Sequence, residues 1–104
     1  MIHMEIILAQ TVHLKTMNQG WSELRKIINS DFVPRKGDFI EDTVWKGDDH
    51  QEVQSVVINY GENYCFVYLP AIDLGTDEKE VLEQYEDMAK LHGWSSSSER
   101  LSLR

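Results

Sequence analysis

The sequence predicts an α+β fold in which a strand, a helix, three strands and a second helix follow one another. Residues 2–14 alternate between apolar and polar side chains, which is typical of a strand, whereas residues 18–30 show helical spacing. Residues 39–70 contain short β-branched segments separated by turn residues. We therefore expect a small antiparallel sheet, or a partly open SH3-like barrel, with two helices packed on it.

The first strand is expected over residues 2–14. Its even positions are apolar except for Gln10, and its odd positions include Glu5 and His13. A period of two predicts one buried face and one solvated face, with a bend or break near Gln10. The apolar even positions are Ile2, Met4, Ile6, Leu8, Val12 and Leu14.

A helix is expected over residues 18–30. Trp21, Leu24, Ile27 and Ile28 lie at i, i+3, i+6 and i+7, on one side of a helix. Pro34 cannot lie inside a helix, so the helix must end before it.

A turn is expected in the stretch FVPRKGDFIED, residues 32–42. Pro34 fixes its own φ angle, and Gly37 can adopt a positive φ or a sharp bend. The composition favours a turn that leads into a strand. The alternative is that Arg35 and Lys36 form a local positive site that binds an anionic group, because arginine can engage a carboxylate or phosphate through two hydrogen bonds.

Three strands are expected between residues 39 and 70: residues 39–40 with 44–45, residues 52–60 and residues 64–70. Turns at 47–50 and 61–63 separate them. In the last strand, Tyr64, Phe66 and Tyr68 share one face, and the other face is also apolar. Either the second face is covered, or this aromatic surface is left for a partner or for a second copy of the chain.

The segments VPRKGDFI, VQSVVINY and FVYL together give the chain a family resemblance. It resembles small uncharacterised bacterial and phage proteins that have a Pro-Arg-x-Gly-Asp/Glu turn before an SH3-like strand meander. The resemblance covers about residues 32–70 and carries no family active site. By analogy it implies a binding module of bacterial or phage type.

The second helix is expected to begin near Asp77 and to end before Gly93. Asp77 or Thr76 would be the N-cap, Asp77 and Glu80 have the spacing of a capping box, and Gly93 suits the left-handed position after the helix. We expect one domain over residues 1–94 and a flexible C-terminal tail over residues 95–104.

Composition limits the class of partner. The 104 residues include 18 acids and 10 Lys or Arg, which gives a formal net charge of −8. This charge disfavours nucleic acids and anionic membranes and favours a protein partner, which could be basic, or a homodimer. The single cysteine, Cys65, excludes an intrachain disulfide and suits the cytoplasm.

No catalytic, cofactor-binding or metal-binding motif is recognisable, so the sequence predicts a non-catalytic cytoplasmic binding or adaptor module without a cofactor. One alternative is an acidic inhibitor or immunity-type protein that masks a basic site on a nucleic-acid enzyme. The other is a small enzyme that uses carboxylates and a histidine, with His50 beside Asp48 and Asp49 as the candidate. The candidate partner-binding residues are Tyr64, Phe66, Tyr68, Arg35, Lys36, Glu83, Glu86 and Asp87.

Overall fold

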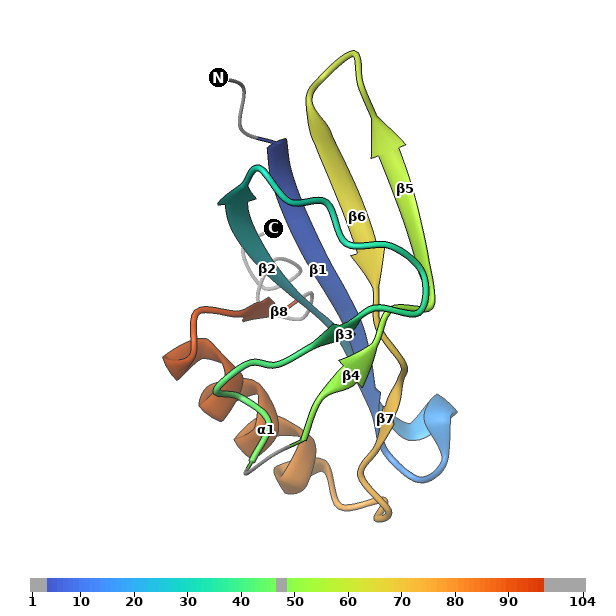
Figure 1. Ribbon diagram of the computed structural model, residues 1–104. Helices are drawn as coiled ribbons and strands as arrows, with labels where there is room; N and C mark the ends of the chain where they lie inside the picture. Colours follow the sequence, from blue (N-terminus) through green and yellow to red (C-terminus); the bar gives the residue numbers. More distant parts are fainter. Residues whose placement is uncertain (1–3, 47–48, 97–104) are drawn as a thin grey trace.

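A mixed six-stranded β-sheet forms the centre of the computed structural model, which describes residues 4–46 and 49–96 (Figure 1). Five strands lie side by side, and a sixth pairs with the end of β1. In spatial order the five are β5 (Ser55–Asn59), β6 (Tyr64–Tyr68), β1 (Met4–His13), β2 (Trp21–Ser30) and β8 (Ser95–Ser96), and the sixth is β7 (Ile72–Asp73). The remaining elements are the 3-10 helix η1 (Met17–Gln19), the two-stranded ladder of β3 (Phe39–Ile40) with β4 (Gln51–Glu52), and helix α1 (Lys79–Leu91).

The predicted fold class is wrong in two respects. The helix expected over residues 18–30 does not form, because residues 21–30 are strand β2, which pairs antiparallel with β1 from Met4↔Ser30 to His13↔Trp21. The sheet is neither purely antiparallel nor an SH3-like barrel with two helices, since β6 and β7 run parallel to β1. Ten residues of pairing with β1 satisfy the backbone groups along one edge of β2 and override its helical spacing.

The prediction of a strand at the N-terminus is confirmed. Ile6, Leu8 and Val12 of β1 are buried on one face, as the period of two requires. Gln10 is also buried, but β1 continues through it without a break. The Gln10 side chain donates from Nε2 to the Pro70 carbonyl over 2.9 Å and accepts from Trp45 Nε1 over 3.2 Å, so its polar groups are satisfied in the core.

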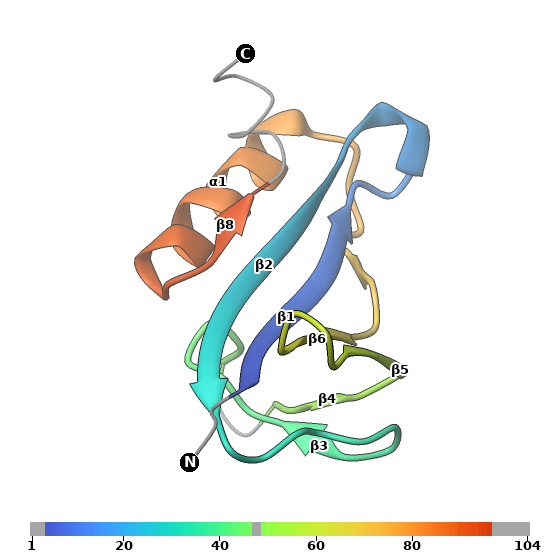
Figure 2. The same ribbon diagram turned by 90° about the horizontal axis from the view of Figure 1, so that it is seen from above.

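One face of the sheet carries the hydrophobic core. Leu24 of β2, Val67 of β6 and Leu82 of α1 all belong to this core, together with Trp45 and Val53 from the segments around β3 and β4. Figure 2 shows α1 beside β8 and β2, whereas β3 and β4 lie nearer β5. Helix α1 and the β3–β4 ladder therefore form a second layer over the same face of the sheet.

The two ends of α1 differ in how well they were predicted. The expected N-cap at Asp77 or Thr76, with its capping box, is wrong because Glu78 occupies the N-cap without a side-chain hydrogen bond. Asp77 instead accepts hydrogen bonds from the Thr16 N–H and hydroxyl, over 2.7 and 3.0 Å.

The C-terminal prediction is confirmed. Gly93 has a φ of 90°, Trp94 N–H donates to the Ala89 carbonyl, and Gly93 N–H donates to the Lys90 carbonyl. These two hydrogen bonds form a Schellman motif.

The strands between residues 39 and 70 are shorter than expected. Val44 and Trp45 are not part of β3, although both are buried. Ser95 and Ser96, expected in a flexible tail, form β8 and pair with β2. The rest of that predicted tail, residues 97–104, and residues 47–48 of the predicted turn lie outside the described residues.

Candidate functional site

An apolar row crosses the face of the sheet opposite the core. The strand registers Val57↔Phe66, Phe66↔Ile7 and Ile7↔Ile27 place these four residues side by side on β5, β6, β1 and β2. We call Val57, Phe66, Ile7 and Ile27 the apolar row. Val57 and Ile27 at its two ends are 56% and 60% exposed.

The three aromatic residues predicted for partner binding lie together on this face. The Tyr64 and Phe66 rings meet edge to face with centroids 5.8 Å apart, and the Phe66 and Tyr68 rings stack at 6.0 Å. The Arg25 guanidinium lies 5.1 Å from the Phe66 ring centroid and is also paired with Glu23. These contacts hold the aromatic side chains in one arrangement along β6.

This open face carries only a small part of the acidic charge of the chain. The strand residues that face this side carry three acids, Glu5, Glu23 and Asp73, and one Lys or Arg, Arg25. Helix α1 and the β3–β4 ladder cover the opposite face, whereas on this face the apolar row is exposed at both ends and partly exposed at Ile7 and Phe66. Exposed apolar surface of this kind marks interaction sites.

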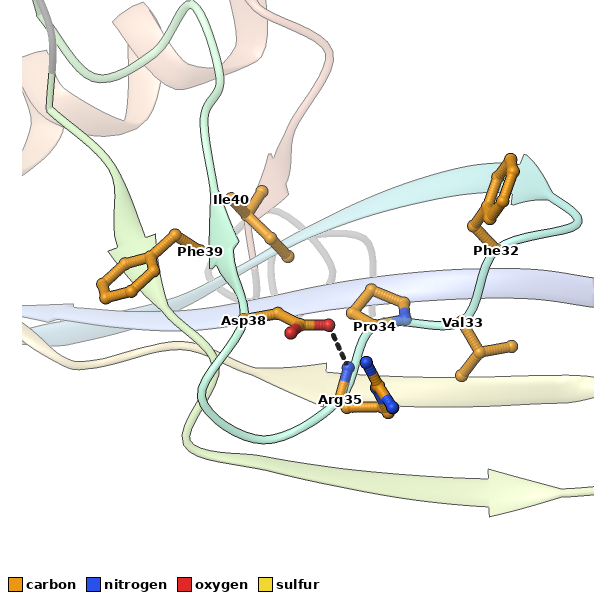
Figure 3. Close-up of a pocket in the computed structure, with 7 residues that line it drawn as sticks. All are labelled: Phe32, Val33, Pro34, Arg35, Asp38, Phe39 and Ile40. Carbon is orange, nitrogen blue, oxygen red and sulfur yellow. Dashed lines mark hydrogen bonds between the residues drawn. The ribbon is translucent and has the colours of Figure 1, made fainter.

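The PRKGD stretch forms the predicted turn. Asp38 N–H donates to the Arg35 carbonyl over 2.9 Å, and Gly37 has a φ of 92° at the third position of the turn. The Asp38 carboxylate in turn accepts from the Arg35 N–H over 2.9 Å (Figure 3). The requirements of the turn therefore explain why a glycine stands at position 37 and an aspartate at position 38.

Two open hollows lie on either side of residues 33–35. The first, of about 580 Å³, is lined by Phe32, Val33, Pro34, Arg35, Asp38, Phe39 and Ile40 (Figure 3). The second, of about 570 Å³, is lined by Val33, Pro34, Arg35, Lys36, Ser55, Val56 and Ile58. Arg35 and Lys36 are exposed at the second hollow, and neither forms an ion pair with any described residue.

The predicted acidic residues lie elsewhere. Glu83 and Asp87 are exposed on α1, whereas Glu86 is only 8% exposed. Since α1 packs on the core face, these acids are separated by the sheet from Tyr64, Phe66 and Tyr68. The structure therefore does not bring the eight candidate residues into one site.

Cys65 and His50 have different surroundings in the structure. Cys65 is fully buried, and burial raises the pKa of its thiol. His50 is exposed and lies edge to face with Phe39 at 4.9 Å, while Asp48 lies outside the described residues. Within residues 4–46 and 49–96, no group of three or more His, Cys, Asp or Glu side chains could hold a metal ion.

Nothing in the sequence pattern predicts Ile27 and Val57 as surface residues. Ile27 falls on the apolar side of the predicted helix, and Val57 is one of several apolar residues in a predicted strand. Only the pairing partners of β2 and β5 show that both residues lie in the same row as Phe66.

No family model, curated protein or solved structure matches this chain. Across the described ranges, none of the helical segments has the length and apolar character needed to span a membrane.

Proposed function

We propose that this chain is a non-catalytic protein-binding module that pairs with a second copy of itself through the open face of the sheet. The observation that carries the proposal is the apolar row of Val57, Phe66, Ile7 and Ile27, which crosses four strands and is exposed at both ends. Association would remove this surface from water and would contribute about 1 kcal/mol or more for each half-exposed aliphatic side chain.

The distribution of charge favours a second copy as the partner. The chain has a formal net charge of −8, but most of its acids lie away from the open face. On that face, Glu5 lies opposite Tyr64 in the strand register on one side of the apolar row, and Arg25 lies opposite Ala9 on the other side. A copy rotated by a half turn about the row would place its Arg25 beside Glu5 of the first copy, on the adjacent strand, and the reverse contact would form by symmetry.

We also propose that the module acts in the cytoplasm. Its one cysteine is buried without a disulfide, which suits a reducing compartment. A bacterial or phage source would fit the resemblance of residues 32–70.

The test is analytical ultracentrifugation of Ile27→Lys and Tyr68→Glu, each compared with the unchanged protein at low and at high salt. Both side chains are more than one third exposed, so the fold should survive the substitutions. We expect a salt-resistant dimer for the unchanged protein and at least a tenfold rise in the dimer dissociation constant for each variant, because a charge would be buried without a partner.

The matched control is Leu91→Lys, which adds the same charge at a residue of α1 that is 86% exposed and lies on the other side of the sheet. It should leave the dimer intact. A monomer at every concentration of the unchanged protein, or equal effects of Leu91→Lys and Ile27→Lys, would contradict the proposal.

The acidic-inhibitor function is the second candidate. Glu80, Glu83 and Asp87 are exposed and lie at i, i+3 and i+7 on α1, which places them on its solvent side. A partner from host lysate that is lost at high salt and by Glu83→Lys with Asp87→Lys, but not by Ile27→Lys, would favour this function over self-association.

A further inference from the structure

Strand β5 is an edge of the sheet. It pairs with β6 on one side and ends the order of strands on the other, as the right-hand side of Figure 1 shows. No described strand or turn forms a backbone hydrogen bond to the outer edge of residues 55–59. Such an edge presents unpaired N–H and C=O groups to an added strand.

An apolar hollow with a positive rim lies beside this edge. Val56 and Ile58, the core-facing residues of β5, form one wall, and Val33 and Pro34 form the other. Arg35 and Lys36 are the charged residues that line this hollow, and no acidic side chain lines it. On a chain with a net charge of −8, this local excess of positive charge complements an anionic group.

The cations lie at one defined end of β5. The turn that carries them is held by hydrogen bonds from Gly37 N–H to the Val53 carbonyl and from Val53 N–H to the Asp38 carbonyl, over 2.9 and 2.8 Å. Val53 comes two residues before Ser55, the first residue of β5. A strand added antiparallel to β5 ends beside Ser55, so its carboxyl terminus would arrive next to Arg35 and Lys36.

We propose that the outer edge of β5 binds the carboxyl-terminal segment of a partner protein as an added antiparallel strand. Arg35 and Lys36 bind the terminal carboxylate, and alternate aliphatic side chains of the segment enter the hollow against Val56 and Ile58. In the added strand, every second side chain would point to this side of the sheet. Main-chain hydrogen bonds supply affinity, and the hollow and its cations supply specificity.

This site goes beyond the proposed function and rests on a different surface. Arg35 and Lys36 lie in the layer that covers the core face, whereas the apolar row lies on the opposite face.

The test is an NMR titration of the full chain with the peptide acetyl-Thr-Val-Thr-Val-Thr-Val, once as the free acid and once as the carboxyl-terminal amide. We expect the backbone amide signals of residues 55–59 to shift with the free acid, and we expect the amide to bind at least about tenfold more weakly, because it loses charge-assisted hydrogen bonds. A third peptide with alternate N-methylated backbone amides should not bind, since it cannot complete a strand ladder.

Two double variants separate the cations of the site from cations elsewhere. Arg35→Gln with Lys36→Gln should abolish the difference between acid and amide, whereas Lys15→Gln with Lys79→Gln removes two exposed charges elsewhere and should preserve it. Equal binding of acid and amide, shifts confined to other residues, or no shift up to the solubility limit of the free acid would overturn the proposal. Repeating the titration on Ile27→Lys shows whether it holds independently of self-association.

Discussion

Lys26 shows how a charged residue can lie on the buried side of a strand. Its Nζ donates to Asp42 Oδ2 over 2.7 Å and to the His92 carbonyl over 2.9 Å. Asp42 also accepts from the Val44 N–H and from Trp94 Nε1. The pair therefore links β2, the segment after β3 and the end of α1, and each polar group compensates for the burial of the other.

The ionisation of Asp42 should make stability depend on pH. Burial alone would raise the pKa of Asp42, but hydrogen bonds from Lys26, Val44 and Trp94, with the charge of Lys26, outweigh it and hold the pKa below the ordinary value of 3.8. Because the folded-state pKa is the lower one, the stabilisation is complete above pH 3.8 and is lost as the pH falls through the folded-state value.

We expect Asp42→Asn to lower the free energy of unfolding at neutral pH by about 2 kcal/mol, because the charge-assisted hydrogen bond from Lys26 is weakened. The acid-induced loss of stability should also become smaller. Urea denaturation at neutral pH and below pH 4 measures both effects, with Glu41→Gln as the exposed neighbouring control. Equal effects of the two substitutions would contradict the role of Asp42.

At the scale of elements, the positions of polar and apolar residues on β2 explain why its sequence predicts a helix. The side that faces the core carries Ser22 and Lys26, whereas the open side carries Trp21 and Ile27. Polar residues inside and apolar residues outside hide the period of two, so the sequence resembles an amphipathic helix. The same exception to the pattern produces the surface that we propose for association, because it leaves apolar residues outside the core.

The end of α1 offers a matched test of backbone conformation. Gly93 has a φ of 90°, which an L-residue adopts only with strain, and an added Cβ would lie 3.4 Å from Lys26 Cε. We expect Gly93→Ala to destabilise the protein by about 1 kcal/mol, measured by urea denaturation. Gly61→Ala is the control, because Gly61 lacks a positive φ and should tolerate alanine. A similar loss for both variants would be evidence against a requirement for the left-handed conformation.

At the scale of the whole molecule, the sheet separates two kinds of surface. Its covered face holds the core and the turn with Arg35 and Lys36, and its open face holds the apolar row. The edge strand β5 belongs to both surfaces, since Val57 points to the open face and Val56 to the covered one. A dimer formed through the open faces would therefore leave two β5 edges available to peptides.

Cys65 provides a measure of the stability of the whole sheet. It is fully buried on β6, between β5 and β1, and burial raises the pKa of its thiol. We expect a thiol reagent such as Ellman's reagent to react only when the sheet opens, with a rate that rises with urea in parallel with global unfolding. The unfolded protein in concentrated urea gives the reference rate. Reaction of the native protein at a comparable rate would show that β6 opens locally.

The sequence by itself determined the parts that depend on neighbouring residues. Local periodicity predicts the alternation of β1 and the shared face of Tyr64, Phe66 and Tyr68. Backbone preference predicts the turn around Gly37 and the end of α1 at Gly93. Only the tertiary structure decided that residues 21–30 are a strand and that Ile27 lies in one row with Val57. The physical reason is that strand pairing satisfies backbone groups between distant segments, and local sequence does not encode which segments meet.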